Sequence, residues 1–305
     1  MAAIDPCSEV YPGLNADFQS TQSKTVALTF DDAPDPQNTA RTLDDLAAAG
    51  LKATFFVNTN NQMNVANDAT AQALLKRIAS EGHTIGSHTV DHIALDDLST
   101  TRIEYELGGL ETTLASLGIA TPKLFRPPHG TPFIRADADT PRVASVVRRH
   151  AVTVLWTFGG NPTLDWDCDA NVQCVLNSYL SWFQSGTSGI PLMHAVKAGT
   201  AGALPQLLAA GKAAGVNFVS VDNFVQERYG MSPAAVVSHI NSTCPDAGWA
   251  AASASSAAAS SGNSGPGRRG GPGDPSNPGG PGGAGPGGPG PRGGGGPVLL
   301  ELTDA

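Results

Sequence analysis

The sequence predicts an α/β fold in which about seven parallel strands form a closed or nearly closed β/α barrel. Short apolar, β-branched runs alternate with amphipathic stretches, a pattern that indicates βαβ units and a parallel sheet. Polar residues with catalytic chemistry fall directly after several of these runs. The carboxyl ends of barrel strands are where βα loops build active sites, so the two observations support one another.

Seven runs are short, apolar and rich in β-branched or aromatic residues, as strands are. They cover residues 25–30, 53–57, 84–87, 124–126, 152–156, 189–193 and 217–221. Six amphipathic stretches lie between them and predict helices over residues 39–49, 70–80, 101–117, 140–150, 172–184 and 203–214. Four of these helices are followed by a glycine, which commonly ends a helix. Either Thr70 or Asp68 is expected to cap the second helix.

The composition changes sharply near residue 250. The chain before it contains 15 Lys+Arg and 24 Asp+Glu, whereas residues 261–297 hold 18 of the 36 glycines in a Gly/Pro-rich stretch. Such a stretch buries too little apolar surface to offset its ordering entropy, and its glycines lack the strict period of collagen. We therefore expect an N-terminal extension over residues 1–23, a folded domain over 24–248 and a disordered Ser/Ala then Gly/Pro-rich tail over 249–305.

The net charge of −9 is carried by the part before residue 250 and argues against nucleic acid or an anionic membrane as a partner. A neutral or cationic polymer is compatible with it, and we expect a monomer. No apolar run approaches 18 residues, so no membrane span is expected. Residues 1–6 lack the charged and apolar pattern of a signal peptide, so either the leader is absent or export does not use that route.

Four cysteines allow three pairings. We favour a Cys168–Cys174 disulfide, which closes a small loop, and a Cys7–Cys244 disulfide, which ties the ends of the folded domain. Four reduced thiols are the alternative. The spacing contains no paired C-x-x-C, so a cysteine zinc site is not expected. Paired thiols would place the protein in an oxidising compartment.

His88 and His92 could share a metal ion, because an i, i+4 spacing on a helical turn puts both imidazoles on one face. A pair of surface histidines is the alternative for such a spacing taken alone. Asp32 follows another strand and would complete a two-His-one-carboxylate set that leaves positions open for water and substrate. One divalent ion is therefore expected: zinc first, with cobalt, manganese or iron accepted by the same ligand types.

Asp31 precedes Asp32 at the same strand end, and we expect the two side chains to diverge, one toward the metal and one toward a metal-bound water. Adjacent carboxylates repel unless cations neutralise them. A metal on Asp32 and Arg126 against Asp31 would do this, and Pro127 and Pro128 would stiffen the chain after Arg126. A simple turn with carboxylates that cap backbone amides is the alternative.

Two further segments complete the set of polar strand ends. Asp165-Trp166 lies in the loop after the fifth strand, and His194 ends the sixth. Taken alone, the first could be an ordinary polar loop and the second a core histidine. The remaining histidines lack partners in these segments, and we expect them to be structural. They are His83, His150 and His239.

Together these segments resemble the five motifs of the polysaccharide deacetylases, carbohydrate esterase family four, also called the NodB-homology domain. The motifs are Thr29-Phe30-Asp31-Asp32, His88-Thr89-Val90-Asp91-His92, Arg126-Pro127-Pro128-His129-Gly130, Asp165-Trp166 and Leu192-Met193-His194. The resemblance extends over residues 24–229 and is closest to the chitin deacetylases. It implies a distorted, incomplete β/α barrel for the catalytic domain.

The resemblance also implies roles for individual residues. Asp32, His88 and His92 would bind the metal. Asp31 would be the general base, oriented by Arg126. His194 would be the general acid, oriented by Asp165.

Substrate contacts follow in the same way. Trp166 and Leu192 would form the walls of an apolar slot for the acetyl methyl, and a backbone N–H near His129 would stabilise the oxyanion. Three positions depart from the family pattern: His129 stands for a usual tyrosine, Ala33 for a glycine and Ala195 for a common aspartate.

The expected function is that of a hydrolase acting on carbon–nitrogen bonds other than peptide bonds. It would remove N-acetyl groups from the N-acetylglucosamine residues of chitin or chito-oligosaccharides, in a secreted or cell-wall location. Peptidoglycan N-acetylglucosamine deacetylation and xylan O-deacetylation are the enzymatic alternatives. A catalytically impaired carbohydrate-binding protein on the same fold is the alternative of another class, suggested by His129 and Ala195.

Overall fold

The computed structural model describes residues 3–135, 137–158 and 165–244 of the chain. The tail expected over residues 249–305 lies outside the described residues.

A seven-stranded parallel sheet forms the centre of the described part, as the sequence predicts. Its strands pair in the order β1-β7-β6-β5-β4-β3-β8. In chain order they are β1 (Gly13–Leu14), β3 (Thr29–Ala33), β4 (Thr54–Val57), β5 (Thr84–Ser87), β6 (Leu124–Phe125), β7 (Val152–Val154) and β8 (Leu192–His194).

The segment that follows β7 makes a few contacts with the chain around the start of β8, the strand at the opposite end of this ladder. The Thr157 N–H donates to the Ile190 carbonyl (3.0 Å), and the Leu192 N–H donates to the Phe158 carbonyl (2.8 Å). A short parallel bridge between Phe158 and Pro191 takes the place of a full strand pairing. The sheet is therefore a half-barrel, which agrees with the distorted, incomplete barrel that the resemblance implied.

The membership of the sheet differs from the expectation at both ends of the chain. Residues 217–221 were expected to form the seventh barrel strand, but β9 (Asn217–Val219) pairs with β2 (Thr25–Ala27) in a separate two-stranded sheet. β1 completes the seven strands instead. A Cβ on Gly13 would lie 2.8 Å from the Thr153 carbonyl oxygen, so glycine permits this close pairing. β1 has only two residues, too few to show the alternation of apolar and polar residues that predicts a strand. The sequence therefore did not predict it.

All six expected helices are present: α1 (Asn38–Ala49), α2 (Ala69–Ser80), α3 (Thr100–Ser116), α4 (Thr140–His150), α6 (Val172–Ser185) and α7 (Ala198–Ala213). The structure adds α5 (Asp165–Cys168), α8 (Val221–Tyr229) and α9 (Pro233–Thr243). Asp68, rather than Thr70, caps α2, because its carboxylate accepts from the Thr70 and Ala71 N–H groups. The four expected glycine stops all have positive φ: Gly50, Gly82, Gly118 and Gly215.

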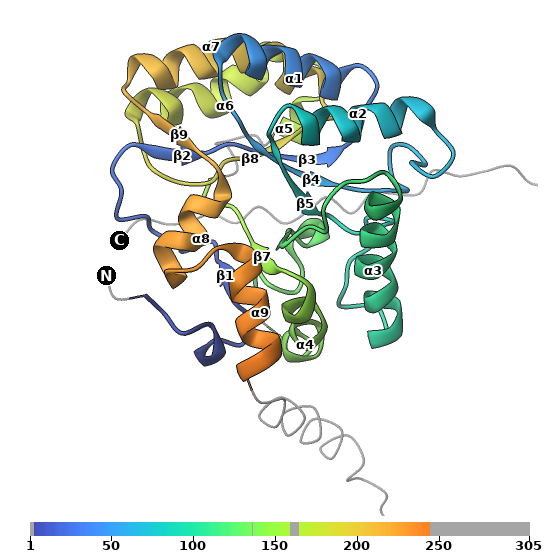
Figure 1. Cartoon of the computed structure of the whole chain (residues 1–305). Coiled ribbons are helices and arrows are strands. Elements are labelled where there is room, and N and C mark those ends of the chain that lie inside the picture. The colour runs from blue at the N-terminus through green and yellow to red at the C-terminus, as the bar shows by residue number, and fades with distance from the viewer. Residues whose placement is uncertain (1–2, 136, 159–164, 245–305) are drawn as a thin grey trace, which may run out of the picture. The chain divides into compact units, whose positions relative to one another are not determined.

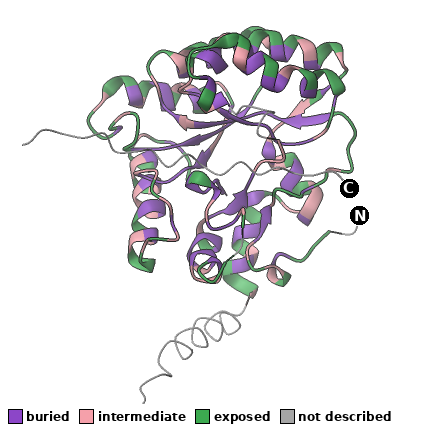
Figure 2. Ribbon diagram, turned by 180° about the vertical axis from the view of Figure 1, so that it is seen from behind, coloured by how far each residue is buried: buried purple, intermediate pink, exposed green. Residues whose placement is uncertain are grey.

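The helices form two groups around the sheet (Figure 1). α1, α2, α6 and α7 lie together in the upper part of that view, and α3, α4, α8 and α9 lie in the lower part, near β1 and β7. Apolar side chains from the first group, the sheet and part of α3 form one large buried cluster, and the second group and the sheet form two smaller clusters. Figure 2 shows the buried strands in the middle and the helices exposed on their outer sides. The sheet thus positions its loops from a core that is packed on both faces.

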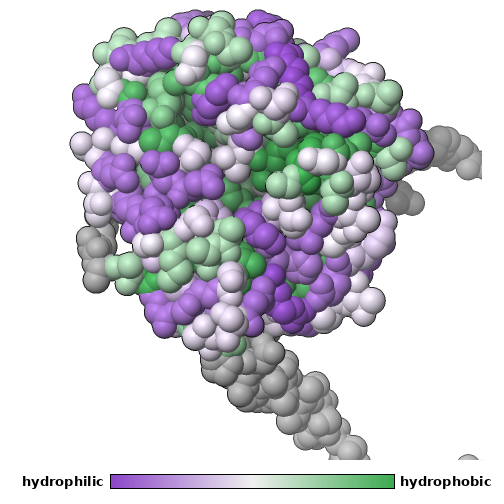
Figure 3. Space-filling model, viewed as in Figure 1, coloured by the Kyte–Doolittle hydropathy of each residue, from purple (hydrophilic) through white to green (hydrophobic). Residues whose placement is uncertain are grey.

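The surface is mixed in character. Figure 3 shows mostly polar residues on the face of Figure 1, with apolar residues visible mainly between the upper and the lower helices. The large hydrophobic residues that are exposed are scattered: Ile4, Val10, Ile93, Tyr105 and Val172. Within the described residues, none of the helices combines the length and apolarity that a bilayer crossing requires.

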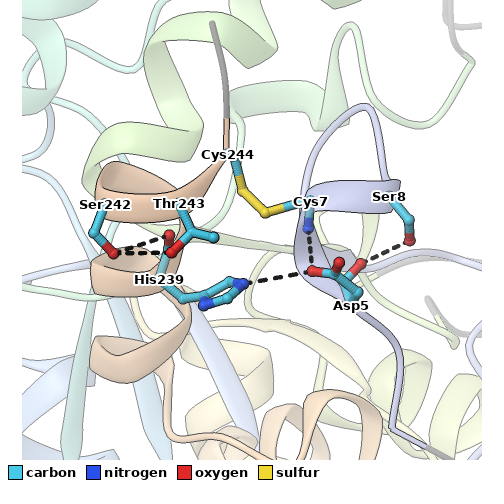
Figure 4. The surroundings of a disulfide bond; sticks show 7 residues. All are labelled: Asp5, Cys7, Ser8, His239, Ser242, Thr243 and Cys244. Atoms are coloured by element: carbon cyan, nitrogen blue, oxygen red, sulfur yellow. Dashed lines mark hydrogen bonds and ion pairs between the residues drawn. A yellow bond between two sulfur atoms is a disulfide. The ribbon is translucent and has the colours of Figure 1, made fainter.

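Both favoured disulfides are formed. Cys7 is joined to Cys244 and Cys168 to Cys174, and none of the four cysteines is free. Figure 4 shows how the first bond fastens the N-terminal segment to the end of α9, beside Asp5 and His239. Its two half-cystines are 237 residues apart in the chain, against six for the second bond. The first bond therefore constrains nearly the whole described chain in the unfolded state.

Replacing Cys7 and Cys244 together by serine should lower the free energy of unfolding by about 2–5 kcal/mol, because the unfolded chain regains the entropy of a long loop. Urea unfolding followed by circular dichroism measures this change. The double replacement of Cys168 and Cys174 is the matched control and should have a smaller effect, since it opens only a short loop. Equal losses in the two variants would contradict this account.

Candidate active site

The carboxyl ends of the parallel strands bring together residues from five separate segments. β3 supplies Asp31 and Asp32, the segment after β5 supplies His88 and His92, and Arg126 follows β6 directly. His194 ends β8, and Asp165 begins α5. Parallel strands end at the same edge of a sheet, so residues as far apart in the chain as Asp31 and His194 become neighbours there.

A β-bulge at Asp32 shapes the centre of the site. The register between β3 and β4 shifts between Asp31 and Ala33, and Asp32 has a φ of +69°. In a regular strand two adjacent side chains point to opposite faces. Here Asp31 Oδ2 lies 3.9 Å and Asp32 Oδ1 3.7 Å from His88 Nε2, while Asp31 Oδ1 pairs with Arg126. The bulge turns both carboxylates toward the same histidine.

The two histidines of the H-x3-H segment are brought together by a loop and not by a helical turn. Thr89 and His92 both have positive φ, and the His92 N–H donates to Thr89 Oγ1 (3.0 Å). The His88 and His92 rings lie 4.8 Å apart between centroids. His92 Nε2 is 3.4 Å from Asp32 Oδ1, so the loop places both imidazoles beside the carboxylate on β3.

Asp32, His88 and His92 form a group whose ligand atoms all lie within 4.8 Å of one another. Donors about 2.0–2.2 Å from a tetrahedral zinc ion lie about 3.3–3.6 Å from each other. The separations of 3.7 and 3.4 Å from Asp32 Oδ1 to the two Nε2 atoms are close to this range. The three residues thus fit a divalent cation.

The protonation states of His88 and His92 also suit a metal site. The His88 Nδ1–H donates to the Arg126 carbonyl (2.7 Å), which leaves Nε2 unprotonated and directed at Asp32. Burial lowers the pKa of His88 well below its ordinary value, and burial with the neighbouring His129 lowers the pKa of His92 to about 4. Both rings are therefore neutral near pH 7, the form that binds metal.

Burial raises the pKa of both Asp31 and Asp32 above the ordinary aspartate value, although the Arg126 guanidinium opposes the shift at Asp31. A cation among the three ligand residues would favour the charged form of both carboxylates.

Arg126 is fully buried and forms an ion pair with Asp31, with 2.8 Å between Nη1 and Oδ1. The same Nη1 donates to Thr29 Oγ1 (2.9 Å), and Nε donates to the Val154 carbonyl (3.1 Å). The guanidinium also lies over the Phe56 ring, 4.2 Å from its centroid. These contacts fix the orientation of Asp31 Oδ1 and leave Oδ2 toward His88.

His194 and Asp165 form a second ion pair, in which Asp165 is buried and the His194 side chain is 13% exposed. His194 Nδ1 lies 2.7 Å from Asp165 Oδ1, and the His194 backbone N–H donates to Asp165 Oδ2 (2.7 Å). Thr200 Oγ1 donates to the same Oδ2 (2.7 Å). Burial lowers the pKa of His194, but the Asp165 carboxylate outweighs it and raises the pKa to about 9. His194 is therefore a cation near pH 7, in contrast to His88 and His92.

Asp31 and His194 are cross-strand partners. β3 and β8 pair in parallel with Asp31 in register with His194, and the Ala195 N–H donates to the Asp31 carbonyl (2.9 Å). Backbones of paired strands lie about 4.8 Å apart, and residues in register share a face of the sheet. A carboxylate and an imidazolium are thus adjacent, with the group of Asp32, His88 and His92 beside them.

The three expected substrate contacts lie at this edge of the sheet. The His129 side chain is exposed, has a φ of +57° and packs edge-on against the His92 ring at 4.8 Å. The Trp166 ring stands at 90° to the His194 ring, 5.3 Å away. Leu192 lies two residues before His194 in β8, on the same face, and is 2% exposed.

Several supporting residues were missed by the sequence analysis. Asn58 donates to the His88 and Thr89 carbonyls, and Asn61 donates to Asp32 Oδ1 (3.5 Å). Asn58 directly follows β4, so the rule that polar residues at strand ends gather could have found it. Thr200 carries no such signal, because it contacts Asp165 only through the packing of α7.

The other histidines have structural partners, as expected. His83 Nδ1 accepts from the Ala53 N–H (3.1 Å) inside the core. His150 lies between Glu104 and Glu111 of α3, and His239 is 3.5 Å from Asp5.

A protein-family model described as polysaccharide deacetylase matches residues 18–153. A peptidoglycan-N-acetylglucosamine deacetylase of Bacillus cereus is 32% identical over 212 residues, which cover 68% of this chain and 90% of that protein. The chain belongs to the polysaccharide deacetylase family.

Two further relatives of this polysaccharide deacetylase carry chitin in their names. A chitin deacetylase of Pestalotiopsis is 33% identical over 203 residues, covering 66% of this chain and 63% of that one. The solved structure of the chitin deacetylase from the fungal pathogen Colletotrichum lindemuthianum matches with a TM-score of 0.58 and 28% identity, over 71% of this chain and 92% of that one. Both the chitin and the peptidoglycan branches are therefore represented among its relatives.

Replacing Asp165 by asparagine should lower the pKa of His194 from about 9 toward or below the ordinary 6.5, because the buried counter-charge is removed. A raised folded-state pKa adds stability that is complete below about pH 6.5 and is lost as the pH rises through about 9. The wild type should therefore lose more stability across this range than the variant. Titration of the His194 ring by NMR measures the pKa directly, and an unchanged value in the variant would refute the role of Asp165.

Proposed function

We propose that this polysaccharide deacetylase hydrolyses the N-acetyl groups of N-acetylglucosamine residues in chitin or chito-oligosaccharides and releases acetate. The observation that supports this best is the register of Asp31 with His194, next to the group of Asp32, His88 and His92. A base, an acid and three metal ligands at one strand edge are the parts that amide hydrolysis requires.

A divalent cation bound by Asp32, His88 and His92 would polarise the acetyl carbonyl and lower the pKa of a water molecule at the site. Zinc is the metal we propose, and cobalt, manganese or iron suit the same ligand types. Asp31 would accept the proton of the attacking water through Oδ2, since its Oδ1 is engaged by Arg126. A base fixed in this way needs no reorientation during the reaction.

His194 would donate the proton that the departing amine requires. Its pKa of about 9 keeps it protonated near pH 7, and the bond from Nδ1 to Asp165 leaves Nε2 as the donor. Trp166, whose ring contacts His194, and Leu192, two residues before His194 in β8, would form the apolar walls for the acetyl methyl. His129, exposed at the edge of the site, would contact the sugar.

Peptidoglycan is the second substrate we consider. The Bacillus cereus relative is named a peptidoglycan-N-acetylglucosamine deacetylase, and the match covers 90% of its length. Chitin and peptidoglycan both lie outside the cytoplasm. Two disulfides support action in an oxidising compartment, so we propose that the protein is secreted or located in the cell wall.

Replacing Asp31 by asparagine should lower acetate release by at least about 100-fold, because general base catalysis is removed, while metal content stays near that of the wild type. Acetate release and metal analysis of the purified variant measure the two effects. Unchanged acetate release would refute the role of Asp31. A wild type that binds sugar without releasing acetate would instead identify a binding protein on this fold.

Acetate release from chitin oligosaccharides, peptidoglycan and acetylated xylan, assayed side by side, should be highest on the first. Chelation should abolish it on every polymer, and zinc should restore it, because the ligand residues supply no Lewis acid of their own. Faster release from peptidoglycan would reassign the substrate. Release that survives complete removal of metal would refute the proposed chemistry.

A further inference from the structure

The loop that carries both histidines has an unfavourable backbone. Thr89 and His92 are non-glycine residues with φ of +73° and +56°. Such a conformation is unfavourable for a non-glycine residue and persists only where contacts with the surrounding structure hold it. His88 is fixed by Arg126, and Asn58 donates to the His88 and Thr89 carbonyls, so these contacts reach the loop only as far as Thr89. Something else must hold the chain between Thr89 and His92.

Glu106 of α3 provides such a contact. Its side chain is fully buried, and Oε2 accepts from two consecutive backbone N–H groups, those of Val90 (2.9 Å) and Asp91 (3.0 Å). Successive N–H groups that converge on one oxygen form an anion-binding concavity. Both N–H groups lie between the two imidazoles, so the carboxylate acts on the strained part of the loop.

Arg102 completes the contact on the other side of Glu106. Its Nε and Nη2 atoms donate to Glu106 Oε1 at 3.0 and 2.7 Å, and Nη2 also donates to Asp91 Oδ2. A buried carboxylate without such a partner would be strongly destabilising. The arginine therefore makes it possible to bury the charge, and it connects α3 to the loop a second time through Asp91.

The surface of α3 is also shaped to accept the loop. A Cβ on Gly109 would lie 3.1 Å from Val90 Cγ2, so the glycine lets Val90 pack closely against the helix. Val90 is 7% exposed and belongs to the main apolar cluster. Its carbonyl accepts from the Asn60 N–H (2.8 Å), so the middle of the loop is held from two sides.

A purely structural role for Glu106 would be served by an ion pair with Arg102 alone. Glu104 of the same helix shows what such a pair looks like: it contacts Arg149 and His150, and its side chain is 39% exposed. Glu106 differs because its second oxygen is used by the backbone of the loop. Its place on the buried side of α3, beside Ile103, Leu107 and Leu110, is unusual for a charged residue.

We propose that Glu106 is a positioning residue, which holds the 88–92 loop in the conformation that presents His88 and His92 to a metal ion. The consequence for metal affinity rests on the proposed function, whereas the effect on the loop does not. Substitutions of groups that orient metal ligands typically weaken metal binding by about 10–100-fold, and we expect Glu106→Gln to fall in this range.

The first experiment needs no metal. Amide hydrogen exchange of the metal-free full-length protein, measured by mass spectrometry on peptides that contain residues 88–92, should be faster in Glu106→Gln than in the wild type. Glu104→Gln is the matched control, since it makes the same change on the same helix and should leave this peptide unchanged. Equal exchange in the wild type and Glu106→Gln, or equal acceleration in both variants, would overturn the proposal.

The second experiment measures Co²⁺ affinity from the visible absorption of the bound ion in competition with a chelator. Glu106→Gln should bind about 10–100-fold more weakly than the wild type and Glu104→Gln equally well. Equal affinity in Glu106→Gln would overturn the positioning role. A wild type that binds no Co²⁺ would refute the metal site of the proposed function and leave the exchange result to decide on Glu106.

If Glu106→Gln does not fold, Asp91→Asn replaces it. This variant removes only the contact from Arg102 to the partly exposed Asp91 and leaves the buried pair intact. It should accelerate exchange in the same peptide by a smaller factor. Unchanged exchange in Asp91→Asn would then count against the proposal.

Discussion

The buried guanidinium of Arg126 joins the parts of the site to each other and to the sheet. It pairs with Asp31 on β3 and donates to the carbonyl of Val154 at the end of β7, while its own carbonyl accepts from His88. A fully buried cation requires a partner and saturated hydrogen bonds, because removal of either leaves an uncompensated charge in the interior. The orientation of the proposed base and of one proposed metal ligand thus depends on the same residue.

The conformational strain of the described chain is concentrated around this residue. Asp32, Thr89, His92 and His129 all have positive φ, and all four lie at the candidate site. Such conformations persist only where contacts with the surrounding structure hold them. Here the contacts come from the β-bulge, from Asn58 and Asn61, and from the carboxylate of Glu106. Asp32 and His92 are brought within 3.4 Å of one another by this strained backbone.

Three imidazoles at one edge of the sheet have two different protonation states. Burial lowers the pKa values of His88 and His92, and both remain neutral although Asp32 Oδ1 lies 3.7 and 3.4 Å from their Nε2 atoms. His194 has Asp165 at 2.7 Å, and its pKa rises to about 9. This difference separates metal-binding residues from a proton donor within one small region, and it arises from the position of a single aspartate.

The sequence by itself determined the alternation of strands and helices and the membership of the family. It also determined that Asp31, Arg126 and His194 lie at strand ends. All of these depend on local patterns. It predicted both disulfides as well. Only the tertiary structure decided that β1 replaces β9 in the sheet and that a bulge turns Asp31 and Asp32 to one side. It also decided that a loop held by Glu106 joins the histidines. The bulge, the two-residue strand and the buried carboxylate all depend on contacts between segments that are distant in the chain. Local sequence patterns do not predict such contacts.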